Sequence, residues 1–171
     1  MTARAANVIT FEMVTAEVRW YVVGCYIPPS DLSTLDAVRG AVQQMPDGCQ
    51  LLVLGDLNAN LSVQHTERDA AVADFLDGED LVDLSRHFRV RMKPGRKGRD
   101  RGIWTWRIER DGTPVQSQPD YVLVREKNKR WVRKLRLRTP RRHGSDHRSV
   151  IVTMCGGNPA KLKELVATPR S

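Results

Sequence analysis

The sequence predicts an α/β sandwich in which helices cover one face of a largely antiparallel or mixed β-sheet. Short runs rich in β-branched and aromatic residues, which are typical of strands, recur along the chain. One segment carries apolar residues at helical spacing, a second begins with residues suited to N-terminal capping, and each lies between predicted strands. The run 50–55 is continuously apolar, as expected of a strand covered on both faces. The predicted order is β-β-α-β-α-β-β-β-β, without internal repeats or linkers.

The first third of the chain is predicted to form two strands and a helix. Segments 8–13 and 18–26 have the composition of strands, and a Pro-Pro pair ends the second of them. Asp31 can then cap a helix that extends to about Met45, because apolar residues recur there every three to four positions.

The remaining elements follow from similar signals. A second helix is predicted from about Thr66 to Leu76, with Thr66 and Asp69 placed for N-terminal capping. Residues 93–101, rich in glycine and arginine, are predicted to form an exposed loop. A final helix is expected after Pro159, because proline suits a first helical position. Further strands are predicted at 103–108, 121–125, 132–137 and 150–154.

Composition favours one globular, intracellular domain, either nuclear or cytoplasmic. The chain has 171 residues, of which 40% are hydrophobic and 28% charged. No apolar run approaches the ~18 residues that span a bilayer, and the amino terminus does not resemble a secretory signal. The three cysteines are widely spaced and form no zinc-binding pattern. Cys25 and Cys49 lie in or beside apolar runs, which predicts buried thiols in a reducing compartment.

Positive charge is concentrated in two parts of the chain. The net charge is +8, and basic residues cluster in the runs 86–101 and 125–142. Clustered lysine and arginine are typical of nucleic-acid binders, because neutralising phosphates releases counterions. The runs therefore predict DNA as a partner, although a solvated cationic surface would explain the charge equally well.

Polar residues follow directly on the buried strand in the motif Gly-Asp-Leu-Asn, at Gly55–Asn58. Ligands of α/β folds bind outside the carboxyl ends of strands, so these residues face a predicted site. If the extended conformation continues, Asp56 and Asn58 lie on the same side of the chain. The carboxylate can then accept a proton from water, and the amide can bind a phosphate oxygen. The alternative is an Asx-rich turn that merely ends the strand.

Three further segments carry candidate functional side chains. Asp146 and His147 immediately precede a predicted strand and offer a hard oxygen ligand beside an imidazole. Asp120 begins an apolar strand, where a charge needs a partner, and a histidine ring is a natural one. Tyr26 ends its strand with a hydroxyl that can reach a phosphate. A surface turn and an interface tyrosine are the structural alternatives.

The order of these motifs resembles the endonuclease/exonuclease/phosphatase family over residues 8–154. Tyr-x-Pro, Gly-Asp-Leu-Asn, a Thr-Trp strand, Asp-Tyr and Ser-Asp-His follow one another as they do in that family. The chain is most similar to the apurinic-type endonuclease domain of non-LTR (LINE-type) retrotransposons. The resemblance implies a partial four-layer α/β sandwich of the DNase I-like type. The supporting segments are Val22–Pro29, Leu51–Asn60, Thr105-Trp106 and Arg141–His147.

The resemblance also implies a role for each catalytic candidate. Asp56 would be the general base that orients or deprotonates the attacking water, and Asn58 would hydrogen-bond the phosphate and steady Asp56. His147 would contact a non-bridging phosphate oxygen and would be oriented by Asp120. Tyr26 would hydrogen-bond the phosphate. Together these groups supply the positioned nucleophile and the charge relief that an in-line displacement requires.

The implied cofactor is Mg²⁺ or Mn²⁺, which Asp146 would help to bind. Arginine and lysine side chains of the two basic runs would bind flanking phosphates without making sequence-specific contacts to the bases. Trp104 and Trp106 are predicted to pack into the core, with contact to DNA as the alternative.

The sequence departs from the family pattern in its first part. The family's complete domain includes an Asn and a strand-end Glu that is its principal metal ligand, and neither has a match here. Glu12 is not assigned that role, because its strand precedes that of Tyr26 too closely. Residues 1–155 are therefore expected to form the domain without its N-terminal part, and 156–171 a helix or tail. Half of the sandwich's inner face would be uncovered, and the missing half or a reverse transcriptase in a longer polyprotein is the expected partner.

Three functions remain open at this point. The first is a Mg²⁺-dependent DNA endonuclease of retrotransposon type. The second is a non-catalytic remnant that binds nucleic acid through its basic surface. The third is a phosphoesterase of the same family that acts on a phosphoinositide or another small phosphoester. The basic runs favour nucleic acid over the third function, and the absent glutamate favours the second over the first.

Overall fold

The structure is a computed structural model that describes residues 4–5, 7–15, 17–62, 66–88, 103–138 and 145–156. Four sequence-based expectations lie wholly or partly outside these residues. They are the exposed loop at 93–101, most of the basic run 86–101, the end of the run 125–142, and the helix or tail at 156–171.

A mixed six-stranded sheet forms the centre of the molecule, in the order β1-β2-β3-β4-β8-β5. Strands β3 and β4 are parallel, and all other neighbours in this sheet are antiparallel. The prediction of a mixed sheet is therefore confirmed. The strands are β1 (Arg4–Ala5), β2 (Val8–Val14), β3 (Arg19–Tyr26), β4 (Cys49–Asp56), β5 (Leu81–Asp83) and β8 (Asp120–Arg125).

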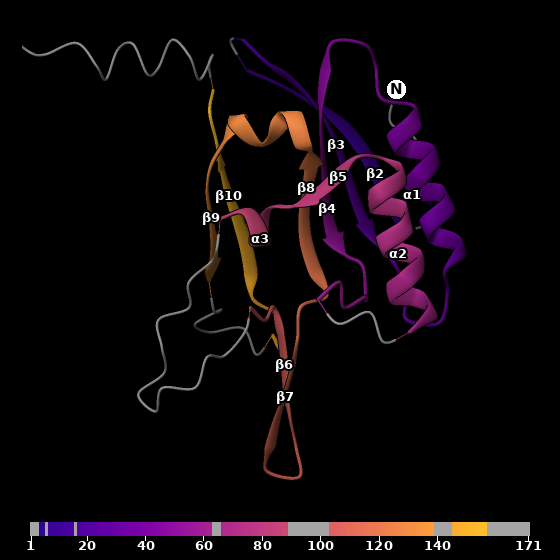
Figure 1. The fold of residues 1–171 in the computed structure, drawn as a ribbon, viewed down its shortest axis with the longest axis vertical. Coiled ribbons are helices and arrows are strands. Elements are labelled where there is room, and N and C mark those ends of the chain that lie inside the picture. Colours follow the sequence, from indigo (N-terminus) through magenta and orange to yellow (C-terminus); the bar gives the residue numbers. More distant parts are fainter. Residues whose placement is uncertain are drawn as a thin grey trace, which may run out of the picture.

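Two helices, α1 (Ser33–Gln43) and α2 (Glu67–Gly78), cover one face of this sheet (Figure 1). Their apolar residues pack with those of β3 and β4 into one core cluster. The first helix begins one residue later than predicted, after Leu32, although the Asp31 carboxylate accepts the Ser33 amide at 2.8 Å.

The second helix has the predicted capping box. The Thr66 hydroxyl accepts the Asp69 amide at 3.1 Å, and the Asp69 carboxylate accepts the Thr66 amide at 3.0 Å. Each side chain satisfies an amide that the first helical turn leaves without a partner. Within the described residues, no helix is long and apolar enough to cross a bilayer.

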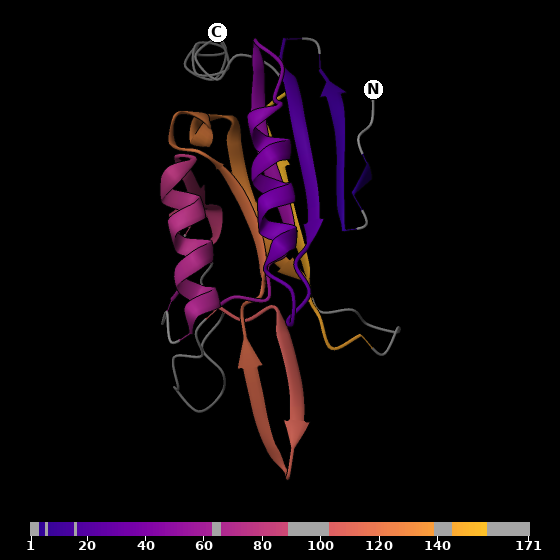
Figure 2. The ribbon, with the colours of Figure 1, turned by 90° about the vertical axis from the view of Figure 1, so that its right-hand side faces the viewer.

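A second, two-stranded sheet packs on the other face of the central sheet. It contains β9 (Val132–Arg138) and β10 (Ser149–Met154), which are antiparallel and lie behind the central sheet in Figure 2. A second core cluster, which includes Trp20, Leu84 and Trp131, fills the space between the sheets. The layers are thus helices, a central sheet and a smaller sheet, as the predicted partial sandwich requires.

Part of the inner face of the central sheet is uncovered, as expected. On β2 the side chains of Ile9, Phe11 and Met13 alternate along the strand and are exposed. Phe11 and Met13 border an open, mainly apolar groove of about 420 Å³, whose other side is formed by Val152 and Met154 of β10. A sheet face of this composition is normally covered by another layer.

The elements that sequence analysis missed are short or polar. A hairpin of β6 (Trp106–Arg110) and β7 (Thr113–Ser117) projects from the body (Figures 1 and 2). The predicted strand 103–108 begins only at Trp106, and the polar strand β7 was not predicted. Its turn, Asp111-Gly112, has φ values of 51° and 72°, the left-handed pair that suits a tight hairpin. Also missed were the short strands β1 and β5, α3 (Leu84–His87) and the 3₁₀ helix η1 (Glu126–Trp131).

The thiols are buried, as predicted for Cys25 and Cys49, and Cys155 is buried too. Cys25 of β3 pairs with Gly55 of β4. Gly55 opposite it has a φ of 154°, and a Cβ atom there would lie 1.8 Å from the Cys25 carbonyl oxygen. Only glycine allows the two backbones to meet at this point, one residue before Asp56.

Replacing Gly55 with alanine should lower the free energy of unfolding by more than about 1 kcal/mol, because the added methyl group collides with backbone. Urea unfolding followed by tryptophan fluorescence measures the change. Gly40→Ala is the matched control, since nothing lies within 4 Å of a Cβ at Gly40 of α1. Alanine should stabilise that helix by about 0.5–1 kcal/mol. Unchanged stability of Gly55→Ala would contradict the close approach of the strands.

Candidate active site

The candidate site lies where β4 ends and β8 begins. Asp56 pairs in register with Tyr26 of β3 on one side and with Asp120 of β8 on the other. The chain after Asp56 stays attached to both neighbours, because the Ile27 amide donates to the Asp56 carbonyl and the Leu57 amide to the Pro119 carbonyl, each at 2.9 Å. These bonds bring three sequence-predicted residues to one edge of the sheet.

Asn58 turns back over Asp56 and does not continue the strand. The Asp56 carboxylate accepts the Asn58 amide at 2.9 Å, and Asn58 has a φ of 47° in the left-handed region that asparagine tolerates. The predicted extended conformation is therefore wrong, and the Asx turn is correct. The turn still serves the site, because the Asn58 side chain donates to the Ile27 carbonyl at 3.0 Å and is fixed in position.

His147 and Asp120 form the predicted pair. Nδ1 of His147 lies 2.8 Å from Oδ2 of Asp120, and both side chains are partly buried. A carboxylate oxygen accepts, so Nδ1 carries the proton and Nε2 is the free acceptor of the neutral ring. The His147 amide donates to the Ser145 hydroxyl at 3.1 Å, which steadies the turn that carries the ring.

Backbone bonds align this pair with the start of β6. The Arg107 amide donates to the Asp146 carbonyl at 3.0 Å, and the Arg148 amide donates to the Thr105 carbonyl at 2.6 Å. The buried Thr105 hydroxyl accepts the Asp120 amide at 3.1 Å. The start of β6 and the turn that carries His147, 40 residues apart in the sequence, are therefore held side by side.

Burial raises the pKa of the Asp56 carboxyl above its ordinary value. The hydrogen bond from the Asn58 backbone amide lowers the pKa, the neighbouring Asp120 charge raises it, and His147 lowers it. The net direction is upward. A carboxylate with a raised pKa is a better proton acceptor, which suits a general base.

Asp56, Asp120 and His147 can also hold a metal ion. One ligand atom from each lies within 4.8 Å of the others, and carboxylate oxygens with an imidazole suit divalent cations such as Mn²⁺ or Zn²⁺, the oxygens alone Mg²⁺. Asp146, the predicted metal ligand, lies outside this group. Its exposed carboxylate accepts the Trp106 indole N–H at 2.7 Å. A metal-binding role for Asp146 therefore stays a prediction.

Tyr26 lies beside Asp56 in the sheet, and its side chain is exposed. That position fits a hydroxyl able to approach a bound phosphate, although its role also stays a prediction. The structure brings five of the candidate residues together: Asp56, Asn58 and Asp120 lie at the edge with Tyr26, and His147 contacts Asp120. Asp146 lies outside the group that could hold a metal ion, and the functional roles of all six residues stay predictions.

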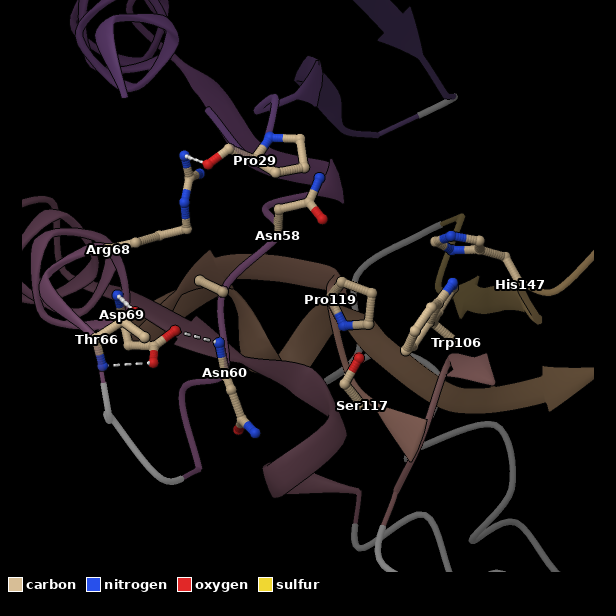
Figure 3. A pocket seen from close by; sticks show the side chains of 11 residues that line it. Pro29, Asn58, Asn60, Thr66, Arg68, Asp69, Trp106, Ser117, Pro119 and His147 are labelled. Carbon is tan, nitrogen blue, oxygen red and sulfur yellow. Dashed lines mark hydrogen bonds between the residues drawn. The ribbon is translucent and has the colours of Figure 1, made fainter. Parts of the chain in front are cut away.

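A pocket of about 640 Å³ opens beside these groups (Figure 3). Asn58 and His147 contribute to its wall, together with two residues that sequence analysis did not assign to the site, Arg68 and Trp106. Nη2 of Arg68 donates to the carbonyls of Pro28 and Pro29 at 2.8 and 2.7 Å, which ties α2 to the loop after β3. No local pattern marks Arg68, because its placement depends on how α2 packs.

The prediction that Trp104 and Trp106 pack into the core is wrong. Trp106 lines the pocket, and both it and Trp104 are only partly buried. Because Thr105 is buried, alternation along the chain turns Trp106 to the opposite side.

No protein-family model matches the sequence, and no curated protein matches it significantly. Solved nuclease structures do match the fold. The endonuclease domain of TRAS1, a telomere-specific non-LTR retrotransposon, aligns with a TM-score of 0.67 at 18% identity, over 86% of this chain and 63% of that one. The AP endonuclease LMAP from Leishmania major aligns at 0.63 and 15% identity, over 90% and 56%.

A 3'-5' exonuclease, NExo from Neisseria meningitidis, aligns at 0.59 and 18% identity, over 87% of this chain and 65% of that one. The chain has the fold of these nucleases. The resemblance to the endonuclease/exonuclease/phosphatase, DNase I-like type is thus confirmed at the level of the fold. The chain spans less than two thirds of the length of each of these structures.

Asp56→Asn should make the protein more stable at pH 7.5 than the unsubstituted form. The folded state binds the Asp56 proton more tightly than the unfolded chain, whose aspartates titrate near about 3.9. Stability is therefore lost as pH rises through the raised pKa, and asparagine, which still accepts the Asn58 amide, removes this loss. The gain should become small toward pH 3.5, about 0.4 pH units below the reference pKa, because Asp56 is then mostly protonated in both states.

Urea unfolding at the two pH values measures this difference. Asp74→Asn is the matched control, because Asp74 is exposed on α2 and its stability change should be small at both pH values. Two results would show that burial does not disfavour the Asp56 charge. One is no gain in stability from Asp56→Asn at about pH 7.5, and the other is an equal gain at both pH values.

Proposed function

We propose that this chain hydrolyses phosphodiester bonds in DNA with a divalent cation, Mg²⁺ or Mn²⁺. The observation that carries the proposal is the Asp120–His147 pair, with a 2.8 Å contact, beside Asp56 and Asn58 at one sheet edge. The likeness of the fold to DNA endonucleases and exonucleases supports it.

Each residue has a role that its contacts support. Asp56, with its raised pKa, accepts a proton from the attacking water, and the Asn58 amide holds its carboxylate in place. His147, oriented through Nδ1 by Asp120, presents Nε2 toward a phosphate oxygen and binds it when protonated. Tyr26 adds a hydroxyl from the neighbouring strand. A bound divalent cation supplies charge neutralisation at the phosphate oxygens.

The charge of the surface favours DNA over a small phosphoester. Net charge is +8, and the described part of the second basic run presents exposed side chains on η1 and β9. Such side chains bind phosphates without regard to sequence. They are Lys127, Arg130, Arg133, Lys134, Arg136 and Arg138.

The likeness to the TRAS1 domain supports a retrotransposon type of endonuclease, with residues 1–155 as the folded unit. The uncovered apolar residues of β2 support a further polypeptide layer, from a longer protein or a partner such as a reverse transcriptase. Exposed apolar patches of this kind mark interaction surfaces.

One observation favours a second candidate, a domain that binds DNA without cutting it. The carboxylate of Asp146 is engaged by the Trp106 indole at 2.7 Å and lies outside the Asp56, Asp120 and His147 group. If phosphodiester hydrolysis requires Asp146 as a cation ligand, this contact competes with it, whereas DNA binding through the basic surface is unaffected.

The purified protein should nick supercoiled plasmid in the presence of Mg²⁺ or Mn²⁺, and EDTA should abolish nicking. Asp56→Asn should reduce the rate by at least about a hundredfold, because removal of a general base typically costs 10²–10⁴-fold. The rate of the unsubstituted protein should fall as pH drops through the raised pKa of Asp56, since only the ionised carboxylate accepts a proton. Gel analysis of relaxed product measures all three effects.

Asp74→Asn on α2 is again the matched control and should nick at the unsubstituted rate. Nicking that survives Asp56→Asn would come from another site or a contaminating nuclease and would contradict the proposal. A protein that binds plasmid in a gel shift but never nicks it would support the second candidate.

A further inference from the structure

Two arginine side chains outside both basic runs lie near the ring of the same tryptophan, close to the candidate site. The Arg148 guanidinium lies 3.7 Å from the centre of the Trp104 ring, and its Nη1 donates to the Trp104 carbonyl at 3.4 Å. The Arg107 guanidinium lies 5.9 Å from the same ring centre. All three residues are partly exposed, so the cluster is accessible to a ligand.

The backbone fixes this cluster relative to the catalytic pair. Arg148 follows His147 directly, and Arg107 follows Trp106, which bridges to His147. The Arg107 amide donates to the Asp146 carbonyl and the Arg148 amide to the Thr105 carbonyl, at 3.0 and 2.6 Å. The positions of the two arginines are therefore set by the same bonds that align the site.

The charges of the cluster attract an anion. Two guanidinium groups approach the same tryptophan ring, and like charges held near one another repel. An anion bound between them relieves that repulsion. The ring of Trp104 holds the Arg148 guanidinium in a fixed plane by a cation–π contact. A planar guanidinium held in this way matches the oxygen pair of a phosphate.

We propose that Arg107 and Arg148, aligned on Trp104, bind one backbone phosphate of DNA next to the phosphate at His147. This inference rests on the proposed function for the nature of the anion, and it deepens it by naming a contact that positions the substrate. Because the contact is to phosphate, it does not depend on base sequence. Neither arginine belongs to the runs 86–101 or 125–142, so the DNA-binding surface extends to the base of the β6–β7 hairpin (Figure 1).

The test is the salt dependence of DNA binding, measured by fluorescence anisotropy with a labelled duplex. EDTA is present, so that binding is separated from cleavage. The logarithm of affinity falls with the logarithm of salt concentration with a slope of about −0.9 for each neutralised phosphate. The double variant Arg107→Gln/Arg148→Gln should reduce the slope by about 0.9, and affinity at moderate salt should fall about tenfold.

Arg110→Gln is the matched control for the single variant Arg107→Gln, because each removes one positive charge from β6 and Arg110 is exposed. It should leave slope and affinity close to those of the unsubstituted protein. Thermal unfolding checks that the variants fold; if the double variant does not, the single variant Arg107→Gln is used and should reduce the slope in the same direction.

An unchanged slope in the folded double variant overturns the inference, as does an equal loss in Arg110→Gln. In both cases plasmid nicking by the unsubstituted protein tests the proposed function independently. A protein that binds an acidic polypeptide but no duplex at low salt overturns both the inference and DNA as the substrate.

Discussion

The pairing of β4 with β8 is the constraint on which the site depends. It sets Asp56 opposite Asp120, although the two are far apart in the sequence, and it places the Asp56 carboxyl beside the ring that Asp120 holds. Gly55 permits the approach of β3 on the other side, so that Tyr26 joins the same edge. Both faces of these strands are packed, one against α1 and α2 and the other against β9 and β10. A change in register by one residue would turn every one of these side chains to the opposite face.

The loop that follows Asp56 is held as firmly as the strands. The Tyr121 hydroxyl accepts the Leu61 amide at 3.2 Å and donates to the Ala59 carbonyl at 3.0 Å, so β8 supports the loop from below. The buried Asp69 carboxylate accepts the Asn60 amide at 2.7 Å, which links the loop to the capping box of α2. If the site binds a phosphate, as proposed, a loop held in this way loses little entropy on binding. The partly buried carboxyl of Asp56, by contrast, costs stability. Under the proposed function, this loss of stability accompanies a better proton acceptor, a common compromise at catalytic sites.

Much of this arrangement was predictable from local patterns in the sequence. The buried strand before Asp56, the capping box of Thr66 and Asp69, and the need of Asp120 for a histidine partner all follow from neighbouring residues and elementary energetics. The features that were missed depend on contacts between distant segments. The polar strand β7 forms only because the Asp111-Gly112 turn folds it onto β6, and Trp106 lines the pocket because the turn before β10 runs beside it. The stack of Arg148 on Trp104 joins residues 44 positions apart, and no sequence spacing predicts such a contact.

The central claim is that Asp120 fixes the His147 ring at the edge of the sheet, next to Asp56. The most direct measurement is the protonation state of the ring nitrogens of His147, read from long-range ¹H–¹⁵N NMR correlations and assigned with a His147→Gln variant. At a pH where the ring is neutral, the proton is expected on Nδ1, held by the Asp120 carboxylate at 2.8 Å, and Asp120→Ala should shift the population toward the Nε2 form. A ring that carries its proton on Nε2 in the unsubstituted protein, or that is indifferent to Asp120→Ala, would contradict the claim.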